Sequence, residues 1–320
     1  MDVSSQEDPA PGLRILITGC AGQLGRELER LFRDFGSLTA VDREAADLAD
    51  PSQIRALVRA AAPDVILNAA AYTAVDRAEE EPDLARDLNA RASRVLAEEA
   101  LARNALLVHY STDYVFDGSK PSPWTEDDAP RPLNAYGLTK LEGEQAIQQT
   151  GGRYLIFRTS WIYGHHGQNF LLTMLRLGGE RQHLSIVDDQ FGAPTSSIAV
   201  ARATRAIVSG VLAGRFGGTE NWAGLYHMTC AGSTSWFGFA QALFARASAR
   251  IGIKAPDIVP IRASEYPAKA RRPRNSVLSN ERLHARFGVQ LPEWQLALDE
   301  VIGALSKARQ AEGANLDVTN

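Results

Sequence analysis

Short apolar runs alternate with amphipathic stretches through the first half of this chain. The runs are hydrophobic on both faces, which is typical of strands in a parallel sheet that helices cover on each side. The longer stretches repeat apolar residues with the helical period. We therefore predict strands over residues 14–18, 37–41, 64–71, 105–112 and 154–161, and helices over 23–35, 51–61, 82–103 and 134–149. This order predicts an α/β fold with a doubly wound parallel sheet.

The alternation breaks down after about residue 165. The second half contains loops rich in glycine and aromatic residues, such as DDQFGAPTSS and GGTENWAGLYH, and shows no repeat. We predict a first domain over 13–165 and a smaller C-terminal α/β lobe over 166–310 that binds the substrate. Some segments of this lobe are expected to return to the first sheet. Residues 1–12 and 311–320 are predicted to be flexible ends.

Composition and charge exclude several classes of function. The 320 residues carry a formal net charge of −4 without a basic block, so nucleic acid is not an expected partner. No window approaches the roughly 18 apolar residues of a membrane span, and the polar start MDVSSQEDPAPG lacks a signal-peptide pattern. Cys20 and Cys230 are too few for a disulfide framework. We therefore expect a cytoplasmic protein.

Three glycines follow the first predicted strand, in the stretch ILITGCAGQLGREL. Gly19 would make the tight turn, Gly22 would let a pyrophosphate approach the backbone, and Gly25 would let the helix pack closely. The phosphates would face the free N–H groups at the start of the helix, where Gln23 and Leu24 lie. The pattern therefore predicts a Rossmann-type domain that binds NAD(P).

Two residues with opposite implications follow the second predicted strand. Asp42 suits the 2′-hydroxyl of the adenosine ribose in NADH, whereas Arg43 suits the 2′-phosphate of NADPH. Asp47 and Leu48 come shortly afterwards, in a position to flank the adenine, although a solvated loop accounts for them nearly as well. The choice between NADH and NADPH therefore stays open at this point.

The paired segments YSTDYVFDG and NAYGLTK contain the residues with the clearest chemistry. Tyr136 and Lys140 lie four positions apart on a predicted helix, so their side chains share one face. A phenol with its ordinary pKa near 10 is a poor acid at neutral pH, and we predict that the Lys140 ammonium lowers this pKa. Thr112, at the end of the fourth predicted strand, offers a hydroxyl to the substrate oxygen. We predict that these three residues are catalytic.

Eight stretches, in order along the chain, resemble dTDP-4-dehydrorhamnose reductases, a family of the extended short-chain dehydrogenase/reductase superfamily. They are ITGCAGQLG, PDVILNAAAYTAVDRAE, VHYSTDYVFDG, NAYGLTKLEGE, FRTSWIYG, DDQFGAPTS, GLYHMTCAG and RRPRNSVLS. The resemblance implies reduction of the C4 ketone of dTDP-4-dehydro-L-rhamnose to dTDP-L-rhamnose by NADPH or NADH, the last step of dTDP-rhamnose synthesis. Tyr136 would donate the proton, and Lys140 would also hold the ribose of the nicotinamide.

The same resemblance implies further binding residues. Small alanines after the third predicted strand would give the cofactor room, and an aromatic residue after the fifth would wall the sugar. The basic loop over residues 271–275 suits a substrate with two linked phosphates, although a plain solvated loop also explains its charge. The additional cofactor contacts are Ala69, Ala70, Ala71 and Tyr110, and the substrate contacts are Thr112, Tyr136, Trp161, Asn169, Arg271 and Asn275.

The same motifs help to distinguish between alternative functions. Related sugar-nucleotide dehydratases carry an acidic pair after the threonine, whereas here Asp113 is followed by Tyr114, which favours ketone reduction. A reductase of another dTDP-4-keto-6-deoxy sugar, as in antibiotic pathways, is one alternative. A non-catalytic NADP-binding regulatory subunit is another, although such a subunit has no need of a tuned phenol.

Two further features of the sequence concern metal binding and the oligomeric state. Some members of the family hold magnesium at a dimer interface through glutamates. Glu27 matches one such position, but Ile198 occupies another, which argues against magnesium here and leaves both a monomer and a homodimer open. His165 and His166 are adjacent rather than at ligand spacing, so we predict a polar loop and no metal site.

Overall fold

The computed structural model describes residues 12–316, with side chains through residue 308. Its centre is a six-stranded parallel sheet with the order β2–β1–β3–β4–β5–β10. These strands are β1 (Arg14–Thr18), β2 (Ser37–Val41), β3 (Val65–Asn68), β4 (Leu106–Thr112), β5 (Tyr154–Thr159) and β10 (Gly224–His227). The strand order reverses between β1 and β3, so the predicted doubly wound, Rossmann-type fold is confirmed, with its switch point beside β1.

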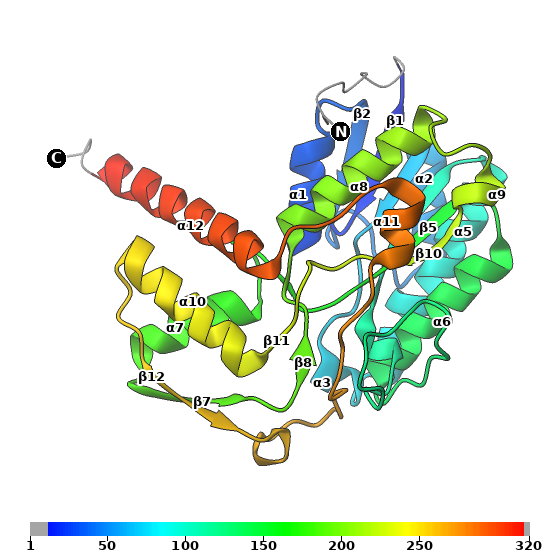
Figure 1. Cartoon of the computed structure of the whole chain (residues 1–320). Coiled ribbons are helices and arrows are strands. Elements are labelled where there is room, and N and C mark those ends of the chain that lie inside the picture. The colour runs from blue at the N-terminus through cyan, green and yellow to red at the C-terminus, as the bar shows by residue number, and fades with distance from the viewer. Residues whose placement is uncertain (1–11, 317–320) are drawn as a thin grey trace.

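Helices cover both faces of this sheet (Figure 1). One layer contains α1 (Gln23–Phe32) and α8 (Ser197–Leu212), and the other contains α2 (Pro51–Ala61), α5 (Ala92–Ala102) and α6 (Ala135–Thr150). Successive strand residues point to opposite faces, so Ile15 and Ile17 enter the core under α1, while Leu16 enters the core under α2. The strands β1, β3, β4 and β5 are therefore largely buried on both sides, as predicted, whereas β2 at the sheet edge stays partly exposed.

A second group of elements lies beside the carboxyl ends of the sheet strands (Figure 1). Its helices α7 (Phe170–Glu180) and α10 (Trp236–Ile251) pack against the parallel strand pair β7 (His183–Val187) and β12 (Asp257–Ile261). The remaining elements are α3 (Val75–Ala78), α4 (Pro82–Arg86), β6 (Ile162–Tyr163), β8 (Phe191–Gly192), β9 (Thr195–Ser196), α9 (Thr219–Trp222), β11 (Thr234–Ser235), α11 (Glu281–Phe287) and α12 (Trp294–Leu316).

The chain passes between the two groups more than once. Both α8 and β10 come from the second half of the sequence, and β10 pairs with β5 at the edge of the sheet. Helix α12 continues to Leu316 and so includes part of the segment 311–320 that we predicted to be a flexible end. Residues 1–11 and 317–320, the rest of the predicted flexible ends, lie outside the described residues.

The predicted helix over residues 82–103 is interrupted. A π-helical turn at Asp87–Arg91 separates α4 from α5. Within this turn, Asn89 Oδ1 accepts a hydrogen bond from the Tyr72 amide at 2.9 Å, and Asn89 Nδ2 donates to Thr139 Oγ1 at 3.1 Å. The extra residue in the turn therefore ties the segment after β3 to α6, and π-turns of this kind often lie at functional sites.

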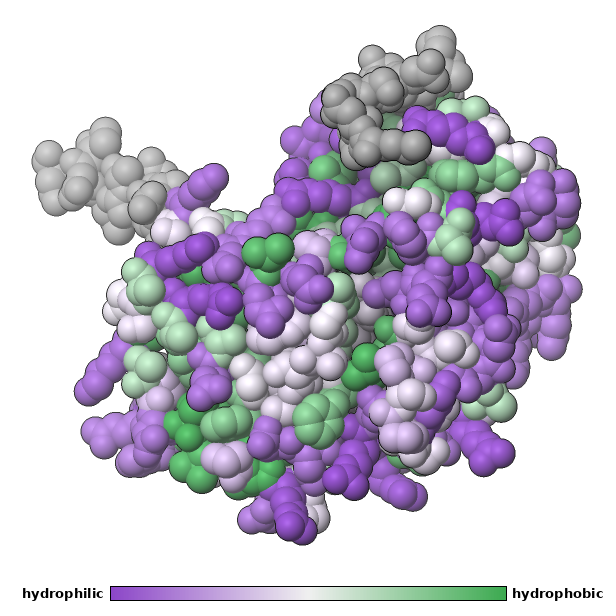
Figure 2. Space-filling view, viewed as in Figure 1, coloured by the Kyte–Doolittle hydropathy of each residue, from purple (hydrophilic) through white to green (hydrophobic). Residues whose placement is uncertain are grey.

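The face shown in Figure 2 is largely hydrophilic, with a small hydrophobic area at lower left over β7 and β12. Val259 on β12 is one of the large apolar residues that stay exposed. Across residues 12–316, none of the helices combines the length and the apolar character that a membrane span requires.

Candidate active site

A cavity of about 410 Å³ lies at the switch point of the sheet. The glycine turn after β1, the end of β2 and the segment after β3 bound it, and α1 begins beside it. A helix N-terminus with free N–H groups favours an anion such as a pyrophosphate. Nine of the predicted cofactor residues line this cavity: Gly19, Gly22, Asp42, Arg43, Asp47, Leu48, Ala69, Ala70 and Ala71.

The glycine turn packs backbone against backbone. Gly19 has a φ of +74°, and a Cβ at this position would lie 2.7 Å from the Ala70 Cα. A Cβ at Gly25 would lie 2.0 Å from the Gly19 carbonyl oxygen, so α1 could not approach the turn with any larger residue there. The glycines at 19 and 25 therefore allow the close packing of the turn, and Gly22 adds no side chain to the cavity.

Three predicted cofactor residues have other surroundings in the structure. Gly25 packs on the turn itself, and Leu24 is buried in the core. The Gln23 side chain turns to the loop before α7, where Nε2 donates to the Gln168 carbonyl at 3.2 Å and Oε1 accepts from Asn169 Nδ2 at 2.9 Å. These residues hold the start of α1 in place and do not line the cavity.

The start of α6 places Tyr136 beside the end of β4. Asn134 caps this helix, with its Oδ1 accepting from the Gly137 amide at 2.8 Å. A Cβ at Gly137 would lie 2.2 Å from the Tyr114 carbonyl oxygen, so glycine lets the helix approach the segment after β4. The Tyr136 ring then packs edge to face on Tyr114, with 5.6 Å between ring centroids. The predicted residues Thr112 and Tyr136 are thus brought together.

The pKa of the Tyr136 phenol is shifted in the opposite direction from the one that the sequence predicted. Burial raises the pKa of Tyr136 to about 12, the Thr112 hydroxyl lowers this pKa, and the Asp113 carboxylate raises it. Lys140 is not among the groups that shift this pKa; its Nζ donates to the Tyr110 carbonyl oxygen at 2.6 Å and lies 3.2 Å from His109 Nε2. Tyr136 is therefore protonated at neutral pH, the form that a proton donor requires.

Lys140 is the first member of a buried polar chain. It is 1% exposed, and burial lowers its pKa to about 8. His109 Nδ1 lies 3.0 Å from Asn68 Nδ2, and Asn68 Oδ1 accepts from the Thr18 hydroxyl at 2.7 Å. Burial and the Lys140 charge lower the pKa of His109 well below its usual value, so His109 is neutral. The chain crosses β4, β3 and β1 and holds the Lys140 amine in place.

Sequence reasoning missed His109, and it used Asp113 only to separate reductases from dehydratases, without a role beside Thr112. Asp113 is 2% exposed, its Oδ1 accepts from the Thr112 hydroxyl at 3.0 Å, and burial raises its pKa to about 6. It orients the hydroxyl that faces Tyr136. A histidine and an aspartate within an otherwise apolar strand-to-helix segment were the available signals, because buried titratable groups gather at functional sites.

A second cavity, of about 590 Å³, lies between β7, α10 and the loop after β12. Arg271 lines it, as do Arg272 and Trp236. Trp161 stacks on Trp236 with 3.5 Å between centroids, and it holds a left-handed φ of +48°. A Cβ at Gly192 would lie 2.5 Å from the Trp161 ring, so glycine makes this stack possible. Such strained backbone is concentrated at binding sites.

Three predicted binding residues make hydrogen bonds within the protein. Asn169 caps α7 and donates to the Gly164 and His166 carbonyls, both at 3.1 Å. Asn275 Nδ2 donates to the Lys120 and Ser122 carbonyls, which fixes the loop after β4. The Tyr110 hydroxyl lies 2.9 Å from Thr204 Oγ1 in the core, and only its backbone carbonyl faces Lys140. Their amide and hydroxyl groups are used to hold the fold.

Comparison with known proteins gives consistent results. A sequence model of the family described as the RmlD substrate binding domain matches residues 13–307. A dTDP-4-dehydrorhamnose reductase from Burkholderia thailandensis is 48% identical over 89% of this chain and 97% of that protein.

Solved structures agree with this match. The crystal structure of a dTDP-4-dehydrorhamnose reductase from Clostridium acetobutylicum has a TM-score of 0.84 and 38% identity, and the match covers 92% of this chain and 99% of that one. The enzyme from Bacillus anthracis, solved in complex with NADP, has a TM-score of 0.82 and 35% identity over 91% and 98% of the two chains. The resemblance stated from the motifs is thus confirmed, and the chain belongs to the dTDP-4-dehydrorhamnose reductase family.

Proposed function

We propose that this chain reduces the C4 ketone of dTDP-4-dehydro-L-rhamnose to the alcohol of dTDP-L-rhamnose, using NADPH or NADH. The observation that carries the proposal is the pairing of Tyr136 with Thr112, one helical turn before the buried Lys140, in a fold that also holds a cavity at the switch point of its sheet. Family membership adds the substrate class, because the similar proteins are dTDP-4-dehydrorhamnose reductases.

The residues of the cavity fit a nicotinamide dinucleotide. Gly19 and Gly22 leave space beside the first turn of α1, and Ala69, Ala70 and Ala71 add small side chains to the lining. When bound, the reduced nicotinamide supplies the hydride for the substrate C4 atom. We propose that the Lys140 amine, which here donates to the Tyr110 carbonyl oxygen, also holds the ribose hydroxyls.

The chain's own residues supply the proton. As C4 gains the hydride, its oxygen gains negative charge, and the Tyr136 hydroxyl gives its proton to that oxygen, which completes the C4 alcohol. The Thr112 hydroxyl, which donates to Asp113 Oδ1 in the structure, turns its single hydrogen to the same oxygen and stabilises the developing charge. Solvent then returns a proton to the Tyr136 phenolate.

A direct assay tests the proposal. The full chain is supplied with dTDP-4-dehydro-L-rhamnose and either NADPH or NADH, and we expect oxidation of the nicotinamide with one equivalent of dTDP-L-rhamnose formed. The product's configuration at C4 is read by NMR. Turnover only with another dTDP-4-keto-6-deoxy sugar would indicate the alternative reductase, and cofactor binding without any turnover would indicate a regulatory subunit.

Arg43 should favour NADPH over NADH. It is exposed at the wall of the cavity, beside Asp42, where a guanidinium suits the 2′-phosphate. We expect Arg43→Ala to raise the KM for NADPH by about tenfold, which corresponds to about 1.4 kcal/mol, and to change the KM for NADH much less. Arg33→Ala, an exposed arginine outside the cavity, is the matched control. Equal effects on both cofactors would contradict a role for Arg43 at the 2′-phosphate.

The affinity of the free enzyme for NADPH should fall as the pH rises through about 8. Burial lowers the pKa of Lys140 to about 8, so its ammonium is present below that pH and lost above it. Fluorescence titrations of NADPH between about pH 7 and pH 9.5 measure this change. Lys140→Met should bind NADPH weakly, and its affinity should not change with pH in this range. Lys254→Met, which replaces an exposed lysine, is the control and should bind NADPH like the unchanged chain. If the NADPH affinity of Lys140→Met also fell as the pH rose, a group other than Lys140 would be responsible for the pH dependence.

A further inference from the structure

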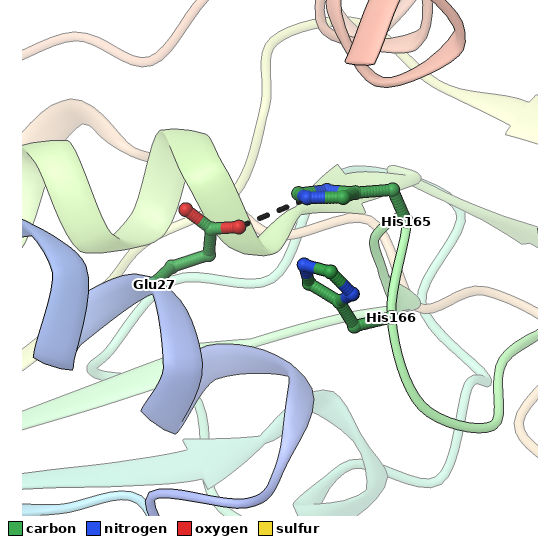
Figure 3. A group of neighbouring side chains, drawn as sticks. All are labelled: Glu27, His165 and His166. Carbon is green, nitrogen blue, oxygen red and sulfur yellow. Dashed lines mark ion pairs between the residues drawn. The ribbon is translucent and has the colours of Figure 1, made fainter. Parts of the chain in front are cut away.

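Glu27, His165 and His166 come together at the junction of the two halves of the chain (Figure 3). Glu27 lies on α1, and the two histidines lie on the loop between β6 and α7. One potential ligand atom from each residue lies within 4.8 Å of the other two. The sequence predicted a polar loop because adjacent histidines lack ligand spacing, but the fold adds a third donor from a distant helix.

The loop that carries the histidines is fixed against α1. Asn169 Nδ2 donates to the His166 carbonyl at 3.1 Å and to Gln23 Oε1 at 2.9 Å, while Gln23 Nε2 donates to the Gln168 carbonyl at 3.2 Å. The backbone of the loop is therefore held by the helix whose side chain completes the group. Only side-chain rotations are needed to change the distances among the three donors.

The carboxylate is oriented toward the histidines. Glu27 is 3% exposed, and its Oε2 accepts from Arg30 Nε at 3.0 Å, which leaves Oε1 facing His165. Oε1 lies 3.7 Å from His165 Nδ1, too far for a hydrogen bond. His165 Nδ1 is buried and has no hydrogen-bond partner among the described residues. A buried polar atom without a partner requires an explanation, and the capacity to bind a cation is one.

The donor set distinguishes between classes of metal ion. Magnesium prefers six oxygen ligands, whereas two imidazoles and one carboxylate suit zinc and similar divalent transition metals. The second glutamate of the family's magnesium site is replaced here by Ile198, which is 4% exposed and apolar. With Zn–N distances of about 2.0 Å, tetrahedral ligand atoms lie about 3.3 Å apart. The ligand atoms here lie within 4.8 Å of one another, so side-chain rotations must bring them closer by up to about 1.5 Å. Because two of the three donors are imidazoles and Ile198 supplies no oxygen, these residues do not fit magnesium.

We propose that Glu27, His165 and His166 bind one zinc-like divalent transition-metal ion within a single chain, with water at the remaining position. The ion would cross-link α1, which borders the dinucleotide cavity, to the loop that leads into α7. Its role is structural, so the expected effect is on stability and does not depend on the proposed reaction.

Metal titration of the untagged, chelator-treated full chain tests this proposal. We expect isothermal titration calorimetry to give one Zn²⁺ site per chain, no site for Mg²⁺ at the same concentrations, and a rise in the thermal midpoint on adding Zn²⁺. Co²⁺ should give the visible absorption of a tetrahedral site. Absence of a stoichiometric Zn²⁺ site would overturn the proposal.

Variants locate the ion. Because even the loss of an outer-shell partner costs about 10- to 100-fold in metal affinity, His165→Ala and His166→Ala should each weaken Zn²⁺ binding at least about tenfold. Both side chains lie on a loop and are partly exposed, so these variants should fold even if Glu27→Gln does not. His183→Ala is the matched control, because His183 is exposed and pairs with Asp257 elsewhere. Zn²⁺ binding that survives both loop variants, or that is lost in the control, would show that the ion binds at another place.

Discussion

Replacing Tyr136 with phenylalanine should lower kcat by about 10²- to 10⁴-fold, the usual loss when a general acid is removed. The substitution removes the buried hydroxyl beside Thr112 but keeps the ring that packs on Tyr114. Affinity for NADPH should be nearly unchanged, because the binding cavity at the switch point keeps its lining residues. Steady-state kinetics and equilibrium titration of the cofactor measure the two quantities separately.

Tyr154→Phe provides the matched control for this substitution. Tyr154 is a half-buried tyrosine at the start of β5, and it packs with the core under α2 and α5. The Tyr154→Phe variant also loses a phenol hydroxyl, but this hydroxyl is not part of the candidate active site. Its kcat should therefore equal that of the unchanged chain. If Tyr136→Phe kept most of its activity, another group would have to supply the proton.

Glu144→Ala should produce the largest loss of stability. Glu144 on α6 and Arg158 on β5 are 1% and 3% exposed, and they form two hydrogen bonds of 2.9 and 2.6 Å. Removing one partner of a buried pair leaves the other charge without compensation, which costs about 3–5 kcal/mol in the free energy of unfolding. Urea unfolding followed by circular dichroism measures this difference.

An exposed ion pair serves as the comparison. Glu180 pairs with Arg176 on α7, where the two side chains are 52% and 61% exposed. Glu180→Ala should change the free energy of unfolding by about 0–1 kcal/mol. Similar losses in the two variants would mean that burial does not decide the strength of the Glu144–Arg158 pair.

Local patterns explain why much of the fold could be predicted. The strands from β1 to β5 appear as apolar runs, and the turn at Gly19 appears as a glycine that directly follows a strand. The residues that line the cavity come from strand ends, which a parallel α/β order places at one edge of the sheet. Tyr136 and Lys140 share a helix, so their common face follows from spacing alone.

Where the structure differs from the sequence prediction, contacts between segments far apart in the chain are the reason. The spacing of Tyr136 and Lys140 predicted that the ammonium would lower the phenol's pKa, but it does not show that the Tyr110 carbonyl and His109 would hold the amine. The π-helical turn depends on the contact of Asn89 with Tyr72 and α6, and no local pattern shows it. Asparagines such as Asn275 look alike whether they bind a ligand or hold a loop.

The position of β10 at the sheet edge has a consequence for synthesis on the ribosome. The edge of β5 stays unpaired until residues 160–223 have been translated and Gly224–His227 has left the exit tunnel. An open strand edge is a template for pairing with another chain. During synthesis, all five partner strands of the sheet are therefore translated while this edge is still open, and the last strand closes it.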